Sequence, residues 1–293
     1  MAIVKPFKAV RPSRDKVALV SSKSFDAYTD KELDAKLEFN PFTFLHIINP
    51  GYKYHQEFTG EQRFQMIHNR YEEFKENKIF IKDTTDSFYI YESSDAHNSF
   101  CGIIAATAVD DYINGCIKKH EGTIKKREEL FESYLKTTGF NAEPVLLTYE
   151  DDENFNNLLL TIQEKRPEYE FSTTDKKLHR LWLVNDEIHI GKITSFFEKK
   201  EALYIADGHH RSASSSLLKK DLQKENNHHN GTENYNYFMS YIIPESNLKI
   251  SEFNRFIKDL NGLTIDEFLI ELDKSYRIEE KGERFYKPSQ KHH

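Results

Sequence analysis

Cysteine is nearly absent from this chain of 293 residues, which contains only Cys101 and Cys116. Two cysteines cannot build a disulfide framework, so a small secreted scaffold held by disulfide bonds is excluded. Neither cysteine has a sequence neighbour that marks a nucleophile, and a buried structural thiol is the default expectation. The cysteine content favours a protein of the reducing cytoplasm.

Long hydrophobic runs are also missing. No stretch approaches the roughly 18 apolar residues of a membrane-spanning helix, and residues 1–6 lack the apolar region of a signal peptide. Basic residues do not predominate, because 41 Lys and Arg face 48 Asp and Glu, for a net charge of −7. This balance argues against a general nucleic-acid binder, which needs a basic face. We expect a soluble, cytoplasmic protein without membrane or nucleic-acid partners, and the oligomeric state stays open.

Aromatic residues are abundant, with 22 Phe and 16 Tyr, so much of the core must be aromatic. Capping boxes are expected at Thr29 with Glu32 and at Thr264 with Glu267. Hydrophobic periodicity predicts helices over residues 29–39, 59–77, 123–138, 155–165 and 264–272, with another after residue 211. Strands are predicted over residues 88–91, 100–109, 144–149, 203–206, 235–243, 276–278 and 285–286, with a hairpin over 181–190 that turns at Asn185-Asp186. This mixed order predicts an α+β (mixed α/β) fold.

The most informative segment is residues 203–211, where an apolar strand ends in Asp207-Gly208 and is followed by His209, His210 and Arg211. A strand, a glycine turn and a helix start direct backbone N–H groups at an anion. Arg211 and two imidazoles add donors suited to phosphate oxygens. Asp207 is a candidate helix cap, Mg²⁺ ligand or proton acceptor. The alternative is an ordinary helix start with a chance histidine pair, but ligand sites of α/β proteins form at such strand ends, so we interpret the segment as a phosphate-binding loop.

A second candidate site is His120-Glu121-Gly122-Thr123, which we expect at the start of the helix over residues 123–138. A carboxylate beside an imidazole and a hydroxyl is suited to general-base chemistry. The alternative is simple helix capping, since glutamate is favourable at a helix N-terminus. A zinc site is not expected here or at the His209-His210 pair, because no further His or Cys follows at the required spacing.

Two further residues are weaker candidates for substrate contacts. Trp182 lies in an apolar run and is able to stack on a base, although a lone Trp in a strand is more often part of the core. Arg11 lies in a segment bounded by Pro6 and Pro12. Its side chain is expected either at a cleft, where it would contact a ligand, or on the surface, where water solvates it.

Several motifs occur in order along the chain and together resemble the DUF1015 family. They are Pro6-Phe7-Lys8-Ala9-Val10-Arg11-Pro12, Asn40-Pro41 with Phe44-Leu45-His46, Asp110-Asp111-Tyr112, Ile117-Lys118-Lys119-His120-Glu121, His179-Arg180-Leu181-Trp182, and Tyr204 through Arg211. The resemblance covers essentially the whole chain. Members of that family usually continue well past the position of His293, so the resemblance implies an incomplete C-terminal part.

The DUF1015 family in turn resembles the ParB/sulfiredoxin superfamily and its free-serine kinases. Those kinases have an Asp-Gly-His-His-Arg-type loop that holds nucleotide phosphates, and a catalytic glutamate in a His-Glu pair that follows an early core strand and opens a helix. Glu121 matches that glutamate. The resemblance implies an N-terminal α/β addition over residues 1–98 and a ParB/sulfiredoxin-like nucleotide-binding core over residues 99–245. Residues 246–293 would be the start of a C-terminal segment.

The residues and the resemblance together predict a small-molecule kinase that phosphorylates free L-serine, or a similar hydroxyl metabolite, with ATP or ADP and Mg²⁺. Glu121 is the expected general base, Asp207 the expected catalytic partner and Mg²⁺ contact, and residues 208–211 the phosphate loop. Further candidate contacts to the substrate or base are His120, Thr123, Trp182 and Arg11. The alternatives are a nucleotide-binding regulatory module without kinase activity, and a nucleotide or phosphoester hydrolase at the same loop.

Overall fold

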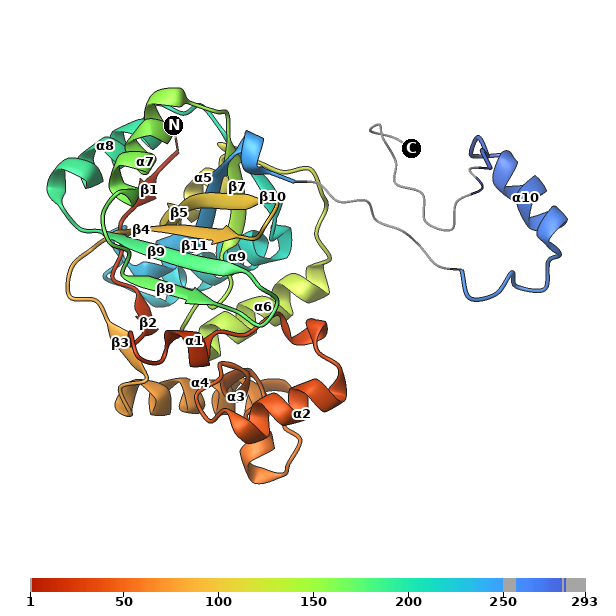
Figure 1. The fold of residues 1–293 in the computed structure, drawn as a ribbon, viewed down its shortest axis with the longest axis horizontal. Helices are drawn as coiled ribbons and strands as arrows, with labels where there is room; N and C mark the ends of the chain where they lie inside the picture. Colours follow the sequence, from red (N-terminus) through yellow and green to blue (C-terminus); the bar gives the residue numbers. More distant parts are fainter. Residues whose placement is uncertain (1, 250–256, 281, 283–293) are drawn as a thin grey trace. The chain divides into compact units, whose positions relative to one another are not determined.

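The structure is a computed structural model that describes residues 2–249, 257–280 and 282. The chain divides into two compact units, Met1–Leu248 and Lys249–His293. Helices and strands alternate along the first unit, and the expected α+β fold is confirmed (Figure 1).

The helices and strands of the first unit have the following bounds. The α-helices are α1 (Val17–Val20), α2 (Asp30–Phe39), α3 (Leu45–Ile48), α4 (Gly60–Glu76), α5 (Val109–Ile113), α6 (Lys125–Thr138), α7 (Glu153–Gln163), α8 (Glu187–Glu198) and α9 (His209–Glu225). Short 3₁₀ turns are η1 (Phe25–Ala27), η2 (Tyr52–Tyr54), η3 (Asn234–Asn236) and η4 (Glu245–Asn247). The strands are β1 (Val4–Lys5), β2 (Val10–Pro12), β3 (Phe80–Lys82), β4 (Phe88–Ser94), β5 (Ser99–Ala108), β6 (Ile117–Lys118), β7 (Val145–Tyr149), β8 (Tyr169–Ser172), β9 (Leu178–Val184), β10 (Leu203–Asp207) and β11 (Tyr237–Pro244).

Nine strands of the described chain form one mixed sheet, in the order β6-β10-β7-β11-β5-β4-β9-β8, with β1 paired to β5. The pairs β10–β6 and β11–β7 are parallel, and the other pairs of this sheet are antiparallel. Strands β1 and β4 come from the first 98 residues and lie in the same sheet as the strands of the predicted core. Strands β2 and β3 form a separate two-stranded sheet.

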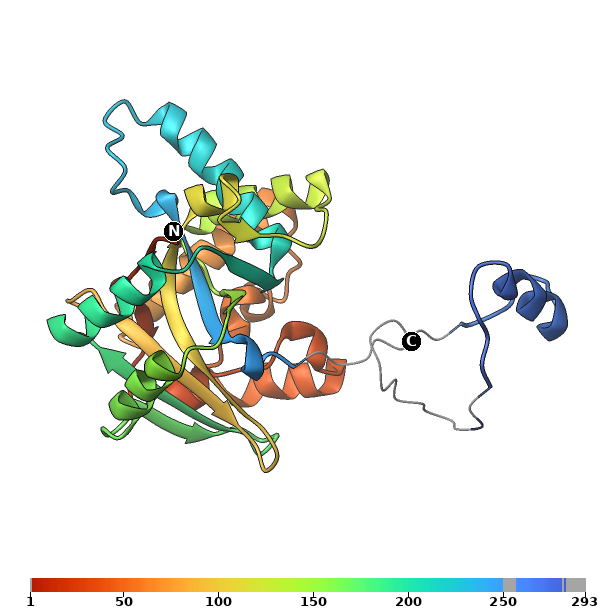
Figure 2. The same ribbon diagram turned by 90° about the horizontal axis from the view of Figure 1, so that it is seen from above.

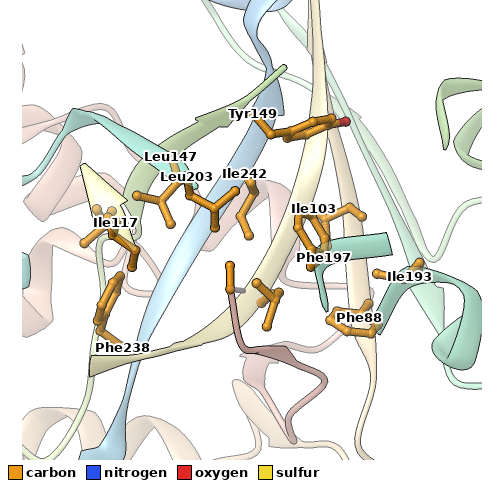
Figure 3. Packing of buried hydrophobic residues seen from close by; sticks show 14 of the residues in the cluster. Phe88, Ile103, Ile117, Leu147, Tyr149, Ile193, Phe197, Leu203, Phe238 and Ile242 are labelled. Carbon is orange, nitrogen blue, oxygen red and sulfur yellow. The ribbon is translucent and has the colours of Figure 1, made fainter. Parts of the chain in front are cut away.

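The main core lies between the sheet and helices that pack on it. Figure 3 shows side chains from several strands and from α8 meeting in this core. Aromatic rings fill one end of it, as composition predicted: the rings of Phe155 and Phe196 stack with centroids 3.6 Å apart, and Tyr149 packs edge-on against Phe197. Each fully buried side chain of this size stabilises the fold by about 1.5–3 kcal/mol. Figure 2 shows the helices α6 and α9 side by side, in agreement with their packing against each other.

A second hydrophobic cluster joins the helices α1, α3 and α4 to β3. Helix α4 confirms the predicted amphipathic helix over residues 59–77, and its side chains Ile67 and Phe74 are buried in this cluster with Val20, Ile47 and Phe80. The expected capping box is present at the start of α2, where Thr29 Oγ1 accepts from Glu32 N and Glu32 Oε2 accepts from Thr29 N.

The predicted hairpin over residues 181–190 is wrong in its second half. Its first half is the end of β9, but residues from Glu187 onward form α8. Asp186 ends the connection as the helix N-cap, since its Oδ1 accepts from His189 N at 3.0 Å. Ile193 and Phe197, four residues apart, are fully buried on one helix face. Residues 187–190 alternate in polarity, and this short pattern hid the longer helical period.

The second unit contains α10 (Ile265–Asp273), which begins at the predicted capping box of Thr264 and Glu267. Residues 276–278 do not form the predicted strand, and the strand predicted at 285–286 lies outside the described residues. In the described ranges, no helix combines the length and apolar character that crossing a bilayer requires.

Candidate functional site

Sheet topology brings the two candidate segments together. Strands β6 and β10 are parallel neighbours, with Leu203 opposite Ile117 and Tyr204 opposite Lys118. Parallel neighbours end at the same edge of a sheet, so the loop at residues 119–124 and the turn at 207–211 leave the sheet side by side. Strand β7 is antiparallel to β10, so its first residue, Val145, lies at that edge as well. Three segments that are distant in the sequence therefore meet at one sheet edge.

The turn after β10 depends on glycine. The strand carries a register shift between Ile205 and Asp207, which re-aims its end. Gly208 follows with φ +99°, and α9 begins at His209. A Cβ at Gly208 would lie 3.3 Å from Val145 Cα and 3.4 Å from Arg211 Cζ. Glycine has no side chain to cap the helix, and the first amides of a helix have no intrahelical acceptor. The predicted arrangement of strand, glycine turn and helix start is present in the backbone, and anion binding at the turn stays a prediction.

The buried face of helix α9 consists mostly of small and polar side chains. Ser212 and Ser214 are fully buried, and their hydroxyls donate to the carbonyls of Gly208 and Arg211 at 3.3 and 3.1 Å. Internal hydrogen bonds of this kind satisfy the hydroxyls without water. The helix packs chiefly against α6.

Arg211 is held at the sheet edge by oxygen atoms from the end of β10 and from the two residues just before β7. Its Nη1 donates to the carbonyl of Pro144, and its Nη2 lies 2.6 Å from Asp207 Oδ2 and 3.8 Å from Glu143 Oε2. Asp207 itself is exposed, with 68% of its side chain accessible. The guanidinium thus points to the mouth of the turn, where it has carboxylates for partners.

A cluster of His120, Glu121 and His209 lies on the other side of the turn. The His209 ring is 5% exposed, and its Nδ1 lies 3.7 Å from Glu121 Oε2. The amide of His120 donates weakly to His209 Nε2 at 3.5 Å, and the two imidazoles meet edge to face with centroids 4.4 Å apart. For Nε2 to accept, Nδ1 must carry the ring proton, so the N–H faces Glu121.

The electrostatics of this cluster favour a neutral His209. Burial lowers the pKa of His209, and the neighbouring His120 lowers it further. Glu121 is 65% exposed, so its carboxylate remains open to a ligand while His209 lies behind it. A buried imidazole that favours the neutral form therefore lies beside an accessible carboxylate.

His210 has a different environment. Its Nδ1 is buried and finds no hydrogen-bond partner among the described residues. His210 is the second residue of α9, so its backbone amide, like that of His209, is one of the donors at the helix start that have no intrahelical acceptor.

The sequence prediction needs a correction at Glu121. Glu121 does not open a helix directly after the strand of residues 99–108, because α5 and the short β6 intervene. Helix α6 begins only at Lys125, so Glu121 lies in the loop between β6 and α6. Thr123 lies in the same loop, and its Oγ1 donates to Glu128 at the first turn of α6.

Trp182 and Arg11 are not brought to this edge. Trp182 lies in β9, five strand positions from β10, which at about 4.8 Å per strand is roughly 24 Å. It is buried, and its indole N–H donates to the carbonyl of Lys165 at 2.8 Å. Arg11 pairs with Asp83 at 2.9 Å and with Glu168 at 3.0 Å. Both side chains have structural partners away from the turn.

Sequence reasoning missed residues that only the sheet order places here. Glu143 and the carbonyl of Pro144 contact Arg211 because β7 is antiparallel to β10. The buried ammonium of Lys219 lies 2.5 Å from Asp110 Oδ1 and joins α9 to α5. This ion pair lies roughly three helical turns along α9 from the Gly208 turn, outside the candidate site. Asp110 belongs to the Asp110-Asp111-Tyr112 motif, whereas no sequence pattern marks Lys219.

The part of the chain that the structure describes has no group of three or more His, Cys, Asp or Glu side chains arranged to hold a metal ion. A metal site built from protein ligands alone therefore does not fit these residues. Asp207 is an exposed carboxylate at the turn, and this donor set fits one protein contact to a Mg²⁺ whose other ligands are phosphates and water.

Comparison with known families adds one finding. The family described as "Protein of unknown function (DUF1015)" matches residues 4–293. The chain belongs to the DUF1015 family. No curated protein and no solved structure matches it at a significant level. The DUF1015 membership predicted from the sequence is confirmed, and the finer resemblance to the ParB/sulfiredoxin superfamily stays a prediction.

Proposed function

We propose that this DUF1015 protein is a small-molecule kinase that transfers the terminal phosphoryl group of ATP or ADP to the hydroxyl of free L-serine or a similar metabolite. One observation carries the proposal. The accessible carboxylate of Glu121 lies beside His209 at the start of α9, at the sheet edge that also carries the Gly208 turn and Arg211. These are the parts that phosphoryl transfer needs, since positioning and charge stabilisation supply most of its catalysis.

The donor phosphates would bind at the turn of Gly208. The amides at the start of α9 would donate to phosphate oxygens, as helix N-termini do for anions. The Arg211 guanidinium would leave Asp207 and Glu143 and pair with the phosphate, because a doubly charged phosphate offers stronger acceptors than an exposed carboxylate. The backbone amide of His209 contributes here, whereas its buried ring does not.

Glu121 would act on the acceptor. The serine hydroxyl attacks the terminal phosphorus, its proton passes to the Glu121 carboxylate, and the bond between phosphorus and the bridging oxygen of the nucleotide breaks. The His209 ring lies beside Glu121, with Nδ1 3.7 Å from Oε2. Because burial and His120 lower the pKa of His209, the ring favours its neutral form and leaves the basicity of the carboxylate intact. Mg²⁺ would supply charge neutralisation on the phosphates, with Asp207 as its protein contact.

The resemblance to free-serine kinases supports serine as the acceptor, and the geometry supports only the wider class of hydroxyl compounds. A regulatory module that binds nucleotide would use the Gly208 turn without Glu121. A hydrolase would use the same turn with water in place of the hydroxyl. The three functions differ in their products, so one assay separates them.

The test incubates the full chain with Mg²⁺, ATP or ADP, and free serine, and measures O-phosphoserine and inorganic phosphate. We expect O-phosphoserine, and we expect Glu121→Gln to lower kcat by about 10²–10⁴-fold with nearly unchanged nucleotide affinity. The matched control is Glu129→Gln, an exposed glutamate on α6 whose partner is Lys125; it should keep full turnover.

Other outcomes reject the proposal in distinct ways. Phosphate without phosphoserine would identify a hydrolase, and binding without turnover would identify a regulatory module. Full turnover in Glu121→Gln would show that Glu121 is not the base. Absence of nucleotide binding would show that the Gly208 turn is not a phosphate site.

A further inference from the structure

A cavity of about 420 Å³ lies in the helical part of the first unit, within the region of the second hydrophobic cluster. Its lining comes from the segment after α2, from α3, from η2, and from the C-terminal half of α4 with the residues after it: Pro41, Phe42, His46, Tyr52, Lys53, Arg70, Glu73, Phe74, Asn77 and Ile79. The volume lies within the range of about 300–1,000 Å³ typical of small-molecule sites. The cavity includes residues of the Asn40–His46 motif, which the proposed kinase site does not use.

The cavity contains a buried arginine whose hydrogen bonds are incomplete. Arg70 is 7% exposed, and its Nη1 donates to Glu73. Its Nε is buried and finds no acceptor among the described residues. A guanidinium has five N–H donors in a planar fork, and an unpaired buried donor is rare in folded proteins. Nε itself is closed off by the surrounding protein, so the donor that remains for a ligand is Nη2, which makes no hydrogen bond to the described residues.

Positive charge exceeds negative charge around the cavity. Lys53 Nζ lies 3.1 Å from Glu73 Oε1, so Glu73 already has two cationic partners, Arg70 and Lys53. His46 adds no charge of its own, because burial lowers its pKa and Arg70 lowers it further. One cation thus remains without a matching carboxylate on the lining.

The remaining lining is apolar and aromatic. Phe42, Phe74 and Ile79 line the cavity, and the ring of Tyr52 lies 5.9 Å from that of His46. A ligand that fits must place a hydrophobic body against these side chains and an acceptor against Arg70.

We propose that this cavity binds a small organic carboxylate with an apolar body, whose carboxylate pairs with Arg70 and whose body lies against Phe42, Phe74 and Ile79. A carboxylate forms a charge-assisted hydrogen bond with a guanidinium, which is stronger than a bond between neutral groups. An amine does not fit, since the carboxylate of Glu73 is already paired to Arg70 and Lys53. A neutral compound would leave the excess cation uncompensated. The site is separate from the Gly208 turn and is independent of the proposed kinase activity.

The test uses three probes of the same shape and different charge. Phenylacetate, 2-phenylethanol and 2-phenylethylamine are titrated into the full chain by calorimetry, and the His46 ring signals are followed by NMR. We expect phenylacetate to bind about tenfold or more tightly than 2-phenylethanol, the amine not to bind, and the His46 signals to shift with phenylacetate.

Variants locate the binding. Arg70→Met should weaken phenylacetate binding about tenfold or more, and Lys53→Met, at a half-exposed residue that does not threaten folding, should weaken it severalfold. The matched control is Lys75→Met on the same helix, whose partner is Glu72 and which does not line the cavity; it should bind normally. Equal binding of the neutral probe, binding unaffected by Lys53→Met with unshifted His46 signals, or no binding of phenylacetate at millimolar concentration would each overturn the proposal.

Discussion

The glycine at the turn after β10 gives a prediction whose size follows from the structure. Gly208 has φ +99°, a conformation that costs a residue with a side chain about 1–3 kcal/mol. Gly208→Ala also places a methyl group 3.3 Å from Val145 Cα, a backbone atom that cannot move without shifting β7. Because strain and close contact add, we expect Gly208→Ala to lower the free energy of unfolding by about 2–3 kcal/mol.

Two other glycines separate these contributions. Gly139 has φ +75° at the end of α6, and no atom lies within 4 Å of the position that a Cβ would take there, so Gly139→Ala should cost only the strain, about 1–2 kcal/mol. Gly191 lies inside α8 without positive φ and with the same open space. Gly191→Ala should therefore stabilise the protein by about 1 kcal/mol through helix propensity.

Urea denaturation of the three variants measures the free energies, and calorimetry measures ADP binding. Gly208→Ala should also weaken ADP binding, because it displaces the Arg211 guanidinium, whose Cζ lies 3.4 Å from the added methyl group. Gly139→Ala should leave ADP binding unchanged. If Gly208→Ala costs no more than Gly139→Ala, the close approach of the turn to β7 is refuted.

Three further predictions concern charged groups. Arg211→Ala should weaken ADP or ATP binding about 10–100-fold, the value of charge-assisted hydrogen bonds to phosphate, and an unchanged dissociation constant from calorimetry would remove Arg211 from the phosphate site. Arg11→Met should instead lower the free energy of unfolding by about 3–5 kcal/mol, because it leaves the buried carboxylate of Asp83 without its cation, whereas Glu168 keeps Arg14 as a partner. Nucleotide affinity should stay unchanged, and a weakened affinity would contradict the structural role of Arg11. Burial lowers the pKa of His46, His179 and His209, so below the ordinary value of about 6.5 the unfolded chain binds more protons than the folded chain. The contribution of these neutral histidines to the free energy of unfolding should therefore be complete at about pH 7.5 and decrease toward about pH 5.5. Urea denaturation at a series of pH values should show a weaker pH dependence for His179→Gln. An unaltered pH dependence in this variant would refute the contribution of His179.

Local patterns predicted several elements because the causes of those elements are local. The Thr29–Glu32 and Thr264–Glu267 capping boxes and the amphipathic period of α4 depend on residues within a few positions of one another. The hairpin prediction failed at Glu187 for the same reason: four residues were too few to distinguish a strand from the first turn of α8.

The sequence by itself determined that a glycine turn joins a strand to a helix here, although the helix begins at His209 and not after residue 211 as predicted, so that only Gly208 lies between the two elements. Only the tertiary structure decided what the turn faces. The parallel pairing of β10 with β6 brings Glu121 to His209, the antiparallel pairing with β7 brings Pro144 to Arg211, and the sheet order separates Trp182 from both. Strand order depends on the packing of segments distant in the sequence, and no local pattern records it.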